Sequence, residues 1–134
     1  MKKMLIIIIA AIVVLGAAAV LYFFVFSGDS DKPLPTFEYS PGDYFVTNVK
    51  DSAKLLKISV VLVVNDESFI ENTLKVKNAQ VRDIIIFNLR NLSQTDIERI
   101  GIEDELRETL LNNLNVVFEG EKFVNIYFND FVMQ

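Results

Sequence analysis

The stretch LLKISVVLVV, residues 55–64, carries the strongest strand signal in the sequence. Apolar residues alternate along it, which places them on one face of a strand. These residues are Ile58, Val60, Leu62 and Val64. Val61 and Val63 make the second half of the stretch apolar on the other face as well. A strand that is apolar on both faces is central or covered, so we expect residues 55–64 to lie inside a sheet.

Helical periodicity follows the turn at residues 65–68. Apolar residues recur at spacings of three and four from residue 69 to residue 92, with a break predicted at Lys77-Asn78. The run Ile84-Ile85-Ile86-Phe87 is too wide for one narrow stripe. We therefore expect this helix to be buried on two sides.

A second amphipathic helix is predicted over residues 102–118. Thr95 and Glu98 have the spacing of a capping box and indicate that the chain restarts a helix before it. The predicted inward positions of the second helix are Ile102, Leu106, Leu110, Leu114 and Val117.

Two further strands are predicted at the ends of this region. Residues 43–49 (DYFVTNV) follow a Pro-Gly turn and form the first strand. Residues 123–134 (FVNIYFNDFVMQ) form the last strand, with Val124, Ile126 and Phe128 on one face. Asn129-Asp130 breaks the alternation, which predicts a bulge or a local bend.

Residues 4–26 (MLIIIIAAIVVLGAAAVLYFFVF) contain no charged side chain. As a helix this segment is roughly 34 Å long, enough to cross a hydrocarbon layer of roughly 30 Å. A cleavable signal peptide is the alternative, because Lys2 and Lys3 precede the segment and residues 17–19 offer a small-residue cleavage site. Cleavage there would leave an exposed apolar N-terminus, so an uncleaved anchor is favoured.

Charge and proline content predict how the rest of the chain is organised. The lysines before the segment and the acidic residues after it place residues 1–3 in the cytoplasm and residues 27–134 outside the membrane. All three prolines, Pro33, Pro35 and Pro41, lie in residues 27–42, which we interpret as a tether before a domain over residues 43–134. Leu34 and Phe37 are apolar in this polar tether and are candidates for a docking contact, although a passive spacer is the simpler interpretation.

Composition argues against several classes of function. Setting Lys2 and Lys3 apart from the 13 basic residues leaves 11 against 18 acidic ones, a net charge of about −7 outside the membrane. Neither nucleic acid nor an anionic lipid surface suits such a charge. The chain has no cysteine or histidine, no nucleophile elbow and no phosphate-binding loop. We therefore expect no catalytic residue, no cofactor and no metal site.

Several segments together resemble one known family. They are a single membrane helix, the strand LLKISVVLVV, the helix VRDIIIFNLRNLS, the segment IEDELRETLLNNLN and the ending VNIYFNDFVMQ. This arrangement is similar to that of the flagellar basal-body-associated FliL family, and the resemblance extends over essentially the whole chain. The resemblance implies an α+β domain of the stomatin/prohibitin (SPFH) type, with helices packed on a curved antiparallel sheet.

The resemblance also implies a function in motility. Members of the family are thought to form a homo-oligomeric ring around the ion-conducting stator of the flagellar motor and to support stator engagement and torque. The implied location is the bacterial inner membrane at the flagellar basal body, with the C-terminal domain in the periplasm. The alternative hypothesis is a membrane-anchored periplasmic binding module without a motor role.

Three groups of residues are candidates for contacts with other proteins. Small residues in the membrane segment allow another helix to approach closely, and aromatic residues gather at its outer end. These are Gly16, Ala17, Ala18, Ala19, Phe23 and Phe24. In the last strand, Asn125, Asn129 and Asp130 are candidates for a subunit contact, although a solvated sheet face is the simpler interpretation. Leu34 and Phe37 complete the set.

Overall fold

The computed structural model describes residues 1–26, 33–120 and 122–134. The chain divides into two compact units, Met1–Leu34 and Pro35–Gln134, and each is described by itself. Residues 27–32 of the expected tether lie outside the described residues.

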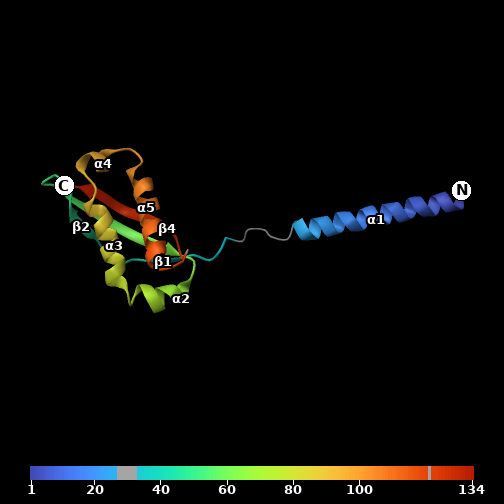
Figure 1. Ribbon diagram of the computed structural model, residues 1–134, viewed down its shortest axis with the longest axis horizontal. Helices are drawn as coiled ribbons and strands as arrows, with labels where there is room; N and C mark the ends of the chain where they lie inside the picture. The colour runs from blue at the N-terminus through green and yellow to red at the C-terminus, as the bar shows by residue number, and fades with distance from the viewer. Residues whose placement is uncertain (27–32, 121) are drawn as a thin grey trace. The chain divides into compact units, whose positions relative to one another are not determined.

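Helix α1 (Lys2–Phe26) belongs to the first unit (Figure 1). Its segment Lys2–Phe23 is long and apolar enough to cross a membrane, a property that a signal sequence shares. Its large apolar side chains that the structure describes are exposed, as Leu15 at 71% illustrates. A continuous apolar surface of this length is stable in lipid and costly in water.

Strand β3 (Leu55–Val64) is the centre of the sheet, as its sequence predicts. On one edge its first residues pair with β2 (Phe45–Asn48) and its last residues pair with β1 (Phe37–Tyr39). Its other edge pairs with β4 (Phe123–Met133), and all of these pairings are antiparallel. The alternating residues predicted to face the core are fully buried: Ile58, Val60, Leu62 and Val64. The sheet begins at Phe37, within residues 27–42 that were expected to form the tether.

Strand β4 contains the predicted bulge. Val60 lies opposite Phe128 and Ser59 lies opposite Asp130, so Asn129 is the extra residue. Because one extra residue reverses the alternation, the side chains that pack on the core beyond the bulge are Phe131 and Met133. Two 2.9 Å hydrogen bonds between the backbones of Leu55 and Gln134 extend the pairing to the last residue.

A second irregularity in β4 contradicts one sequence prediction. The register shifts between Val63, which lies opposite Asn125, and Val64, which lies opposite Phe123. Val124 is therefore the extra residue, and its side chain is 43% exposed where it was expected to share the face of Ile126. Phe123 takes the core position and is buried.

Helices α3 (Asn78–Arg90) and α5 (Ile102–Val117) cover one face of the sheet (Figure 1). The buried row on α3 is Val81, Ile85 and Leu89, and that on α5 is Ile102, Leu106, Leu110 and Leu114. Val117 was expected inward but is 42% exposed. Since the row on α5 advances by four residues, its continuation is Phe118, which packs against the core.

Helix α3 is not buried on two sides. Ile85 is fully buried and its neighbours Ile84 and Ile86 are half-buried, but Phe87 is 68% exposed. A helix in a single layer over a sheet buries only the side that faces the sheet and its neighbouring helix. The apolar run is therefore wider than the surface that the domain itself covers.

Shorter elements join the layers. Asp66 caps α2 (Glu67–Phe69) by accepting a 3.0 Å bond from the Ser68 amide, and α2 continues into the π-helical turn η1 (Ile70–Leu74). The predicted break at Lys77-Asn78 is confirmed, because α3 begins at Asn78.

The capping box before α5 lies two residues earlier than predicted. It caps α4 (Gln94–Glu98) and is formed by Ser93 and Asp96, not by Thr95 and Glu98. Ser93 has the extended backbone that an N-cap needs, whereas Thr95 lies inside the helix.

Candidate interaction surfaces

A polar network fixes the segment between β1 and β2 to α3. The Tyr39 hydroxyl donates to the Asn78 side-chain oxygen at 2.9 Å, and the Asn78 amide group donates to the Pro41 carbonyl at 3.2 Å. Arg82 also donates to the Pro41 carbonyl, at 3.0 Å, and its guanidinium stacks 4.5 Å from the ring centre of buried Phe45. Charge-assisted bonds of this kind are stronger than neutral ones. The start of the sheet is therefore rigidly placed against α3.

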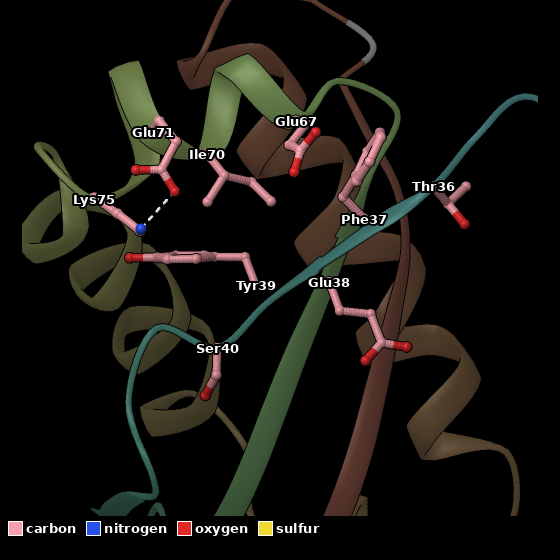
Figure 2. Close-up of a pocket in the computed structure, with 9 residues that line it drawn as sticks. All are labelled: Thr36, Phe37, Glu38, Tyr39, Ser40, Glu67, Ile70, Glu71 and Lys75. Carbon is pink, nitrogen blue, oxygen red and sulfur yellow. Dashed lines mark hydrogen bonds and ion pairs between the residues drawn. The ribbon is translucent and has the colours of Figure 1, made fainter.

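This network supports one end of a groove of about 500 Å³ beside β1 (Figure 2). Residues 36–40 form one wall, and Glu67, Ile70, Glu71 and Lys75 form the other. In Figure 2, Phe37 and Tyr39 point toward the helical turns and Glu38 points away from them. Burial raises the pKa of the Tyr39 hydroxyl, partly offset by the nearby positive charge of Lys75. Tyr39 therefore stays a hydrogen-bond donor throughout the physiological pH range.

The residues that line this groove are of the kinds found in sites that bind peptides. Glu71 and Lys75 form an exposed ion pair one helical turn apart, which contributes little to stability. Within the described ranges, no group of three or more acidic, cysteine or histidine side chains could hold a metal ion. The groove offers an edge strand, two rings and a mixed-charge rim, which are features of a recognition surface.

The outer edge of β4 is partly closed by side chains of α5. Asn115 bonds both backbone groups of Phe123, donating to the carbonyl at 2.9 Å and accepting from the amide at 3.0 Å. Arg107 donates to the Ile126 carbonyl at 2.8 Å and also pairs with Asp104. These contacts cover the first half of the edge, and from the rest of the described chain only β3 bonds the backbone of residues 129–133.

The three candidate contact residues of the last strand fall into two places. Asn125 is half-buried in the half of β4 that α5 covers. Asn129 and Asp130 are exposed and lie together at the bulge, where the edge is open. The structure thus brings Asn129 and Asp130 together and separates Asn125 from them.

The other candidates also separate. Gly16, Ala17, Ala18, Ala19 and Phe23 lie on α1, where Phe23 is 73% exposed. Apart from its chain neighbours and the adjacent helix backbone, no described atom lies within 4 Å of a methyl group placed on Gly16. The side chain of Phe24 lies outside the described part of the structure. Leu34 is exposed, whereas Phe37 belongs to β1 and packs against the core.

One apolar surface was missed by sequence reasoning. Phe87 on α3 and Val116 on α5 are 68% and 76% exposed, and a hollow of about 300 Å³ lies between the two helices beside them. The signal was present, because Asp83 and Arg90 lie on the same side of α3 as Phe87 and charged neighbours indicate a solvent-facing stripe.

Comparison with known proteins identifies the domain. A search of curated proteins returns no significant match. The family model described as flagellar basal body-associated protein FliL matches residues 39–134, which extend from the end of β1 through β4. This range includes the core, the groove wall on α2 and η1, and the edge of β4. The chain therefore belongs to the FliL family of flagellar basal body-associated proteins.

Proposed function

We propose that this protein is a non-enzymatic component of the flagellar motor that associates with the ion-conducting stator and supports its engagement and torque. The observation that carries the proposal is the combination, in one short chain, of an apolar helix able to span a membrane and a FliL domain over residues 39–134. An anchor of this kind holds a domain beside integral membrane proteins such as the stator.

The proposed arrangement places each segment on one side of the inner membrane. Residues 1–3 are cytoplasmic and residues 4–26 cross the bilayer. The domain that includes β1 from Phe37 onward is periplasmic, and the residues between the membrane segment and β1 form the tether. The two lysines at the N-terminal end of the helix support this orientation. The antiparallel sheet with helices on one face is compatible with an SPFH-like domain.

Copies of the domain form a ring around the stator in this proposal. A ring requires head-to-tail contacts that repeat around an axis. Asn129 and Asp130, at the open part of the β4 edge, are proposed to contribute to one side of that contact, with Asn125 nearby. The small-residue patch Gly16–Ala19, together with Phe23 and Phe24, is proposed to meet stator helices. Leu34 is proposed to contact the stator on the periplasmic side of the membrane. Phe37, the first residue of β1, is proposed to contribute to the same contact.

Co-purification from membranes tests this function. Full-length protein is compared with a variant in which residues 4–26 are replaced by an unrelated membrane helix, and the purified particles are imaged. If the wild-type domains encircle the stator and the variant with the unrelated helix does not, recognition through the anchor is supported. Absence of the protein from an intact stator would reject the motor role.

A second pair of variants tests the ring. Replacing Asn129 and Asp130 with lysine should reduce the number of copies around the stator, because long charged side chains block a strand edge. Asn112→Lys, at an exposed position of α5, is the matched control. Equal occupancy in both variants would place the ring contact elsewhere.

The alternative is an anchored periplasmic binding module without a motor role. The groove of about 500 Å³ beside β1 favours it, because a cavity of that size with an edge strand on one wall can hold an extended peptide. Motility that is unchanged in a deletion strain, with the stator retained, would favour this alternative.

A further inference from the structure

On the exposed side of α3, an aromatic residue lies between two residues of opposite charge. Asp83 lies four residues before Phe87 and Arg90 lies three residues after it, and all three side chains are exposed. Neither Asp83 nor Arg90 forms an ion pair within residues 1–26, 33–120 and 122–134. An acidic group, an aromatic ring and a basic group therefore follow one another along one stripe.

Phe87 stands between two hollows. One, of about 300 Å³, lies toward α5 and is walled by Ile84, Val116 and Val117. The other, of about 320 Å³, lies on the opposite side and is walled by Ile86 and Arg90. A large exposed ring beside a hollow provides both halves of a knob-and-socket contact on one surface.

We propose that this face, defined by Asp83, Phe87, Arg90 and Val116, binds the same face of a second copy of the chain in an antiparallel, two-fold arrangement of the α3 helices. A two-fold contact requires a surface that is complementary to itself. With Phe87 near the axis, Asp83 lies about 6 Å and Arg90 about 4.5 Å along the helix on either side of it. The Asp83 of each copy then lies opposite the Arg90 of the other, which gives two such pairs in the dimer.

The charges of the face favour a second copy over an unrelated partner. The described domain is acidic overall, which opposes self-association in general. On this face, however, the charges of Asp83 and Arg90 cancel. Both charges are paired only when the partner presents a basic group opposite Asp83 and an acidic group opposite Arg90, as an antiparallel second copy does. Val116, 76% exposed, enlarges the apolar area that the dimer removes from water.

This contact does not rest on the proposed motor function. A ring uses head-to-tail contacts, whereas the α3 contact is two-fold, so the two can coexist or fail separately. Because each copy carries a helix able to span a membrane, confinement to one bilayer raises the local concentration of partners.

Disulfide cross-linking in native membranes tests the geometry. The chain has no cysteine, so introduced thiols are the only ones present. Differently tagged Asp83→Cys and Arg90→Cys chains are co-expressed, which preserves one native Asp83–Arg90 pair in each mixed dimer. A cross-link between the tags is expected, and each variant alone should give none, because the axial separation of like residues is about 9–12 Å and a disulfide needs Cα atoms within about 7 Å.

Co-expressed Glu105→Cys and Asn112→Cys chains are the matched control, with the same spacing on exposed positions of α5. This pair should give no cross-link. Equal cross-linking by the control pair, or by either α3 variant alone, would overturn the antiparallel arrangement. So would absence of a cross-link in the mixed α3 pair.

Charge exchange provides a second readout in full-length protein in detergent, by sedimentation equilibrium. Asp83→Arg and Arg90→Asp should each weaken dimerisation, and the double exchange should restore it, because the complementary order is recovered. Phe87→Ser should weaken dimerisation about thirtyfold, as expected for a central aromatic anchor. Val76→Ser, at a side chain that is 77% exposed outside this face, should change nothing. Failure of the double exchange to restore binding, or equal effects of the two serine variants, would reject the proposal.

Discussion

Substituting Gly42 tests the network that fixes the start of the sheet to α3. Gly42 has φ +153°, and a β-carbon added to it would lie 2.1 Å from one terminal nitrogen of Arg82. The obstructing atom is the far end of a flexible side chain, so the guanidinium can move while the backbone stays in place. In Gly42→Ala the guanidinium must therefore leave both the Pro41 carbonyl and the Phe45 ring.

The cost can be estimated from the contacts that are lost. A hydrogen bond from a charged donor contributes about 1.5–2 kcal/mol, and a partly exposed cation–π contact contributes about 0.5–1 kcal/mol. A side chain at this backbone conformation adds about 1–2 kcal/mol of strain. Asn78 still bonds the Pro41 carbonyl, so no buried acceptor is left unpaired. Together these terms predict that Gly42→Ala lowers the free energy of unfolding by about 3–5 kcal/mol.

Urea unfolding of the full-length protein in mild detergent, followed by near-ultraviolet circular dichroism, measures this loss. Gly101→Ala is the matched control: Gly101 has φ +86°, but an added β-carbon meets nothing within 4 Å. It should lose only the strain, about 1–2 kcal/mol. In an Arg82→Ala background, Gly42→Ala should likewise lose only the strain. If the Gly42→Ala and Arg82→Ala losses simply add, the steric argument is refuted.

Three other substitutions have specific outcomes. Asn115→Ala removes both bonds to the backbone of Phe123, so the free energy of unfolding should fall by about 2 kcal/mol and the Phe123 amide should exchange faster in NMR. Thr47→Val should raise the free energy of unfolding in urea by about 1 kcal/mol, because the buried hydroxyl has no hydrogen-bond partner among the described residues. Hydrogen bonds from Lys122 and Ser68 lower the pKa of Asp66 from 3.8 to about 2. The stability that Asp66 adds over Asp66→Asn should therefore be complete above about pH 4 and disappear as the pH falls through 2, measured by thermal unfolding.

Each of these predictions has a control or an outcome that would contradict it. Asn112→Ala, on the exposed side of the same helix as Asn115, should leave both stability and amide exchange unchanged. A loss of stability in Thr47→Val would mean that the hydroxyl makes a favourable bond in solution. Lys122→Met should reproduce much of the altered acid response of Asp66→Asn, since the Lys122 hydrogen bond is the largest cause of the lowered pKa. A wild-type acid response in Lys122→Met would show that the Asp66 pKa is set mainly by Ser68.

The elements of the core could be predicted because burial on one side is a local property of the sequence. Alternation in residues 55–64 predicted both the strand and its central place, and both are confirmed. The four-residue steps from Ile102 to Leu114 predicted the buried row of α5. The interruption at Asn129-Asp130 predicted the bulge in β4. In each case the signal lies within one element.

The predictions that failed depend on segments distant in the sequence. Val124 is displaced because β4 shifts register against β3, which no pattern within β4 reveals. Phe87 is exposed because a single layer of helices covers the sheet, and the apolar run alone indicated deeper burial. Thr95 was predicted as the N-cap, but Ser93 is the N-cap. Both residue types can cap a helix, and the backbone conformation decides which of them does.

The candidate contact surfaces were only partly accessible from the sequence. Polar residues at the bulge were recognised because they break an apolar alternation. The hydrogen bonds from Asn115 and Arg107 that cover part of the β4 edge were not predicted, because they join residues 8 and 19 positions apart in the sequence. The groove beside β1 was missed for the same reason, since residues 41–66 separate its two walls in the sequence.

The position of β3 has a consequence for the order in which the domain forms. Its partners on one edge precede it in the chain, but its other edge is completed by β4, and Leu56 pairs with Met133 far along the sequence. While the chain is being synthesised, the central strand of the sheet has an open edge until residues 123–134 emerge. Such an edge can pair with the wrong chain. The sheet can therefore be completed only after the last residues of the chain have been made, and its long-range pairing makes folding slow.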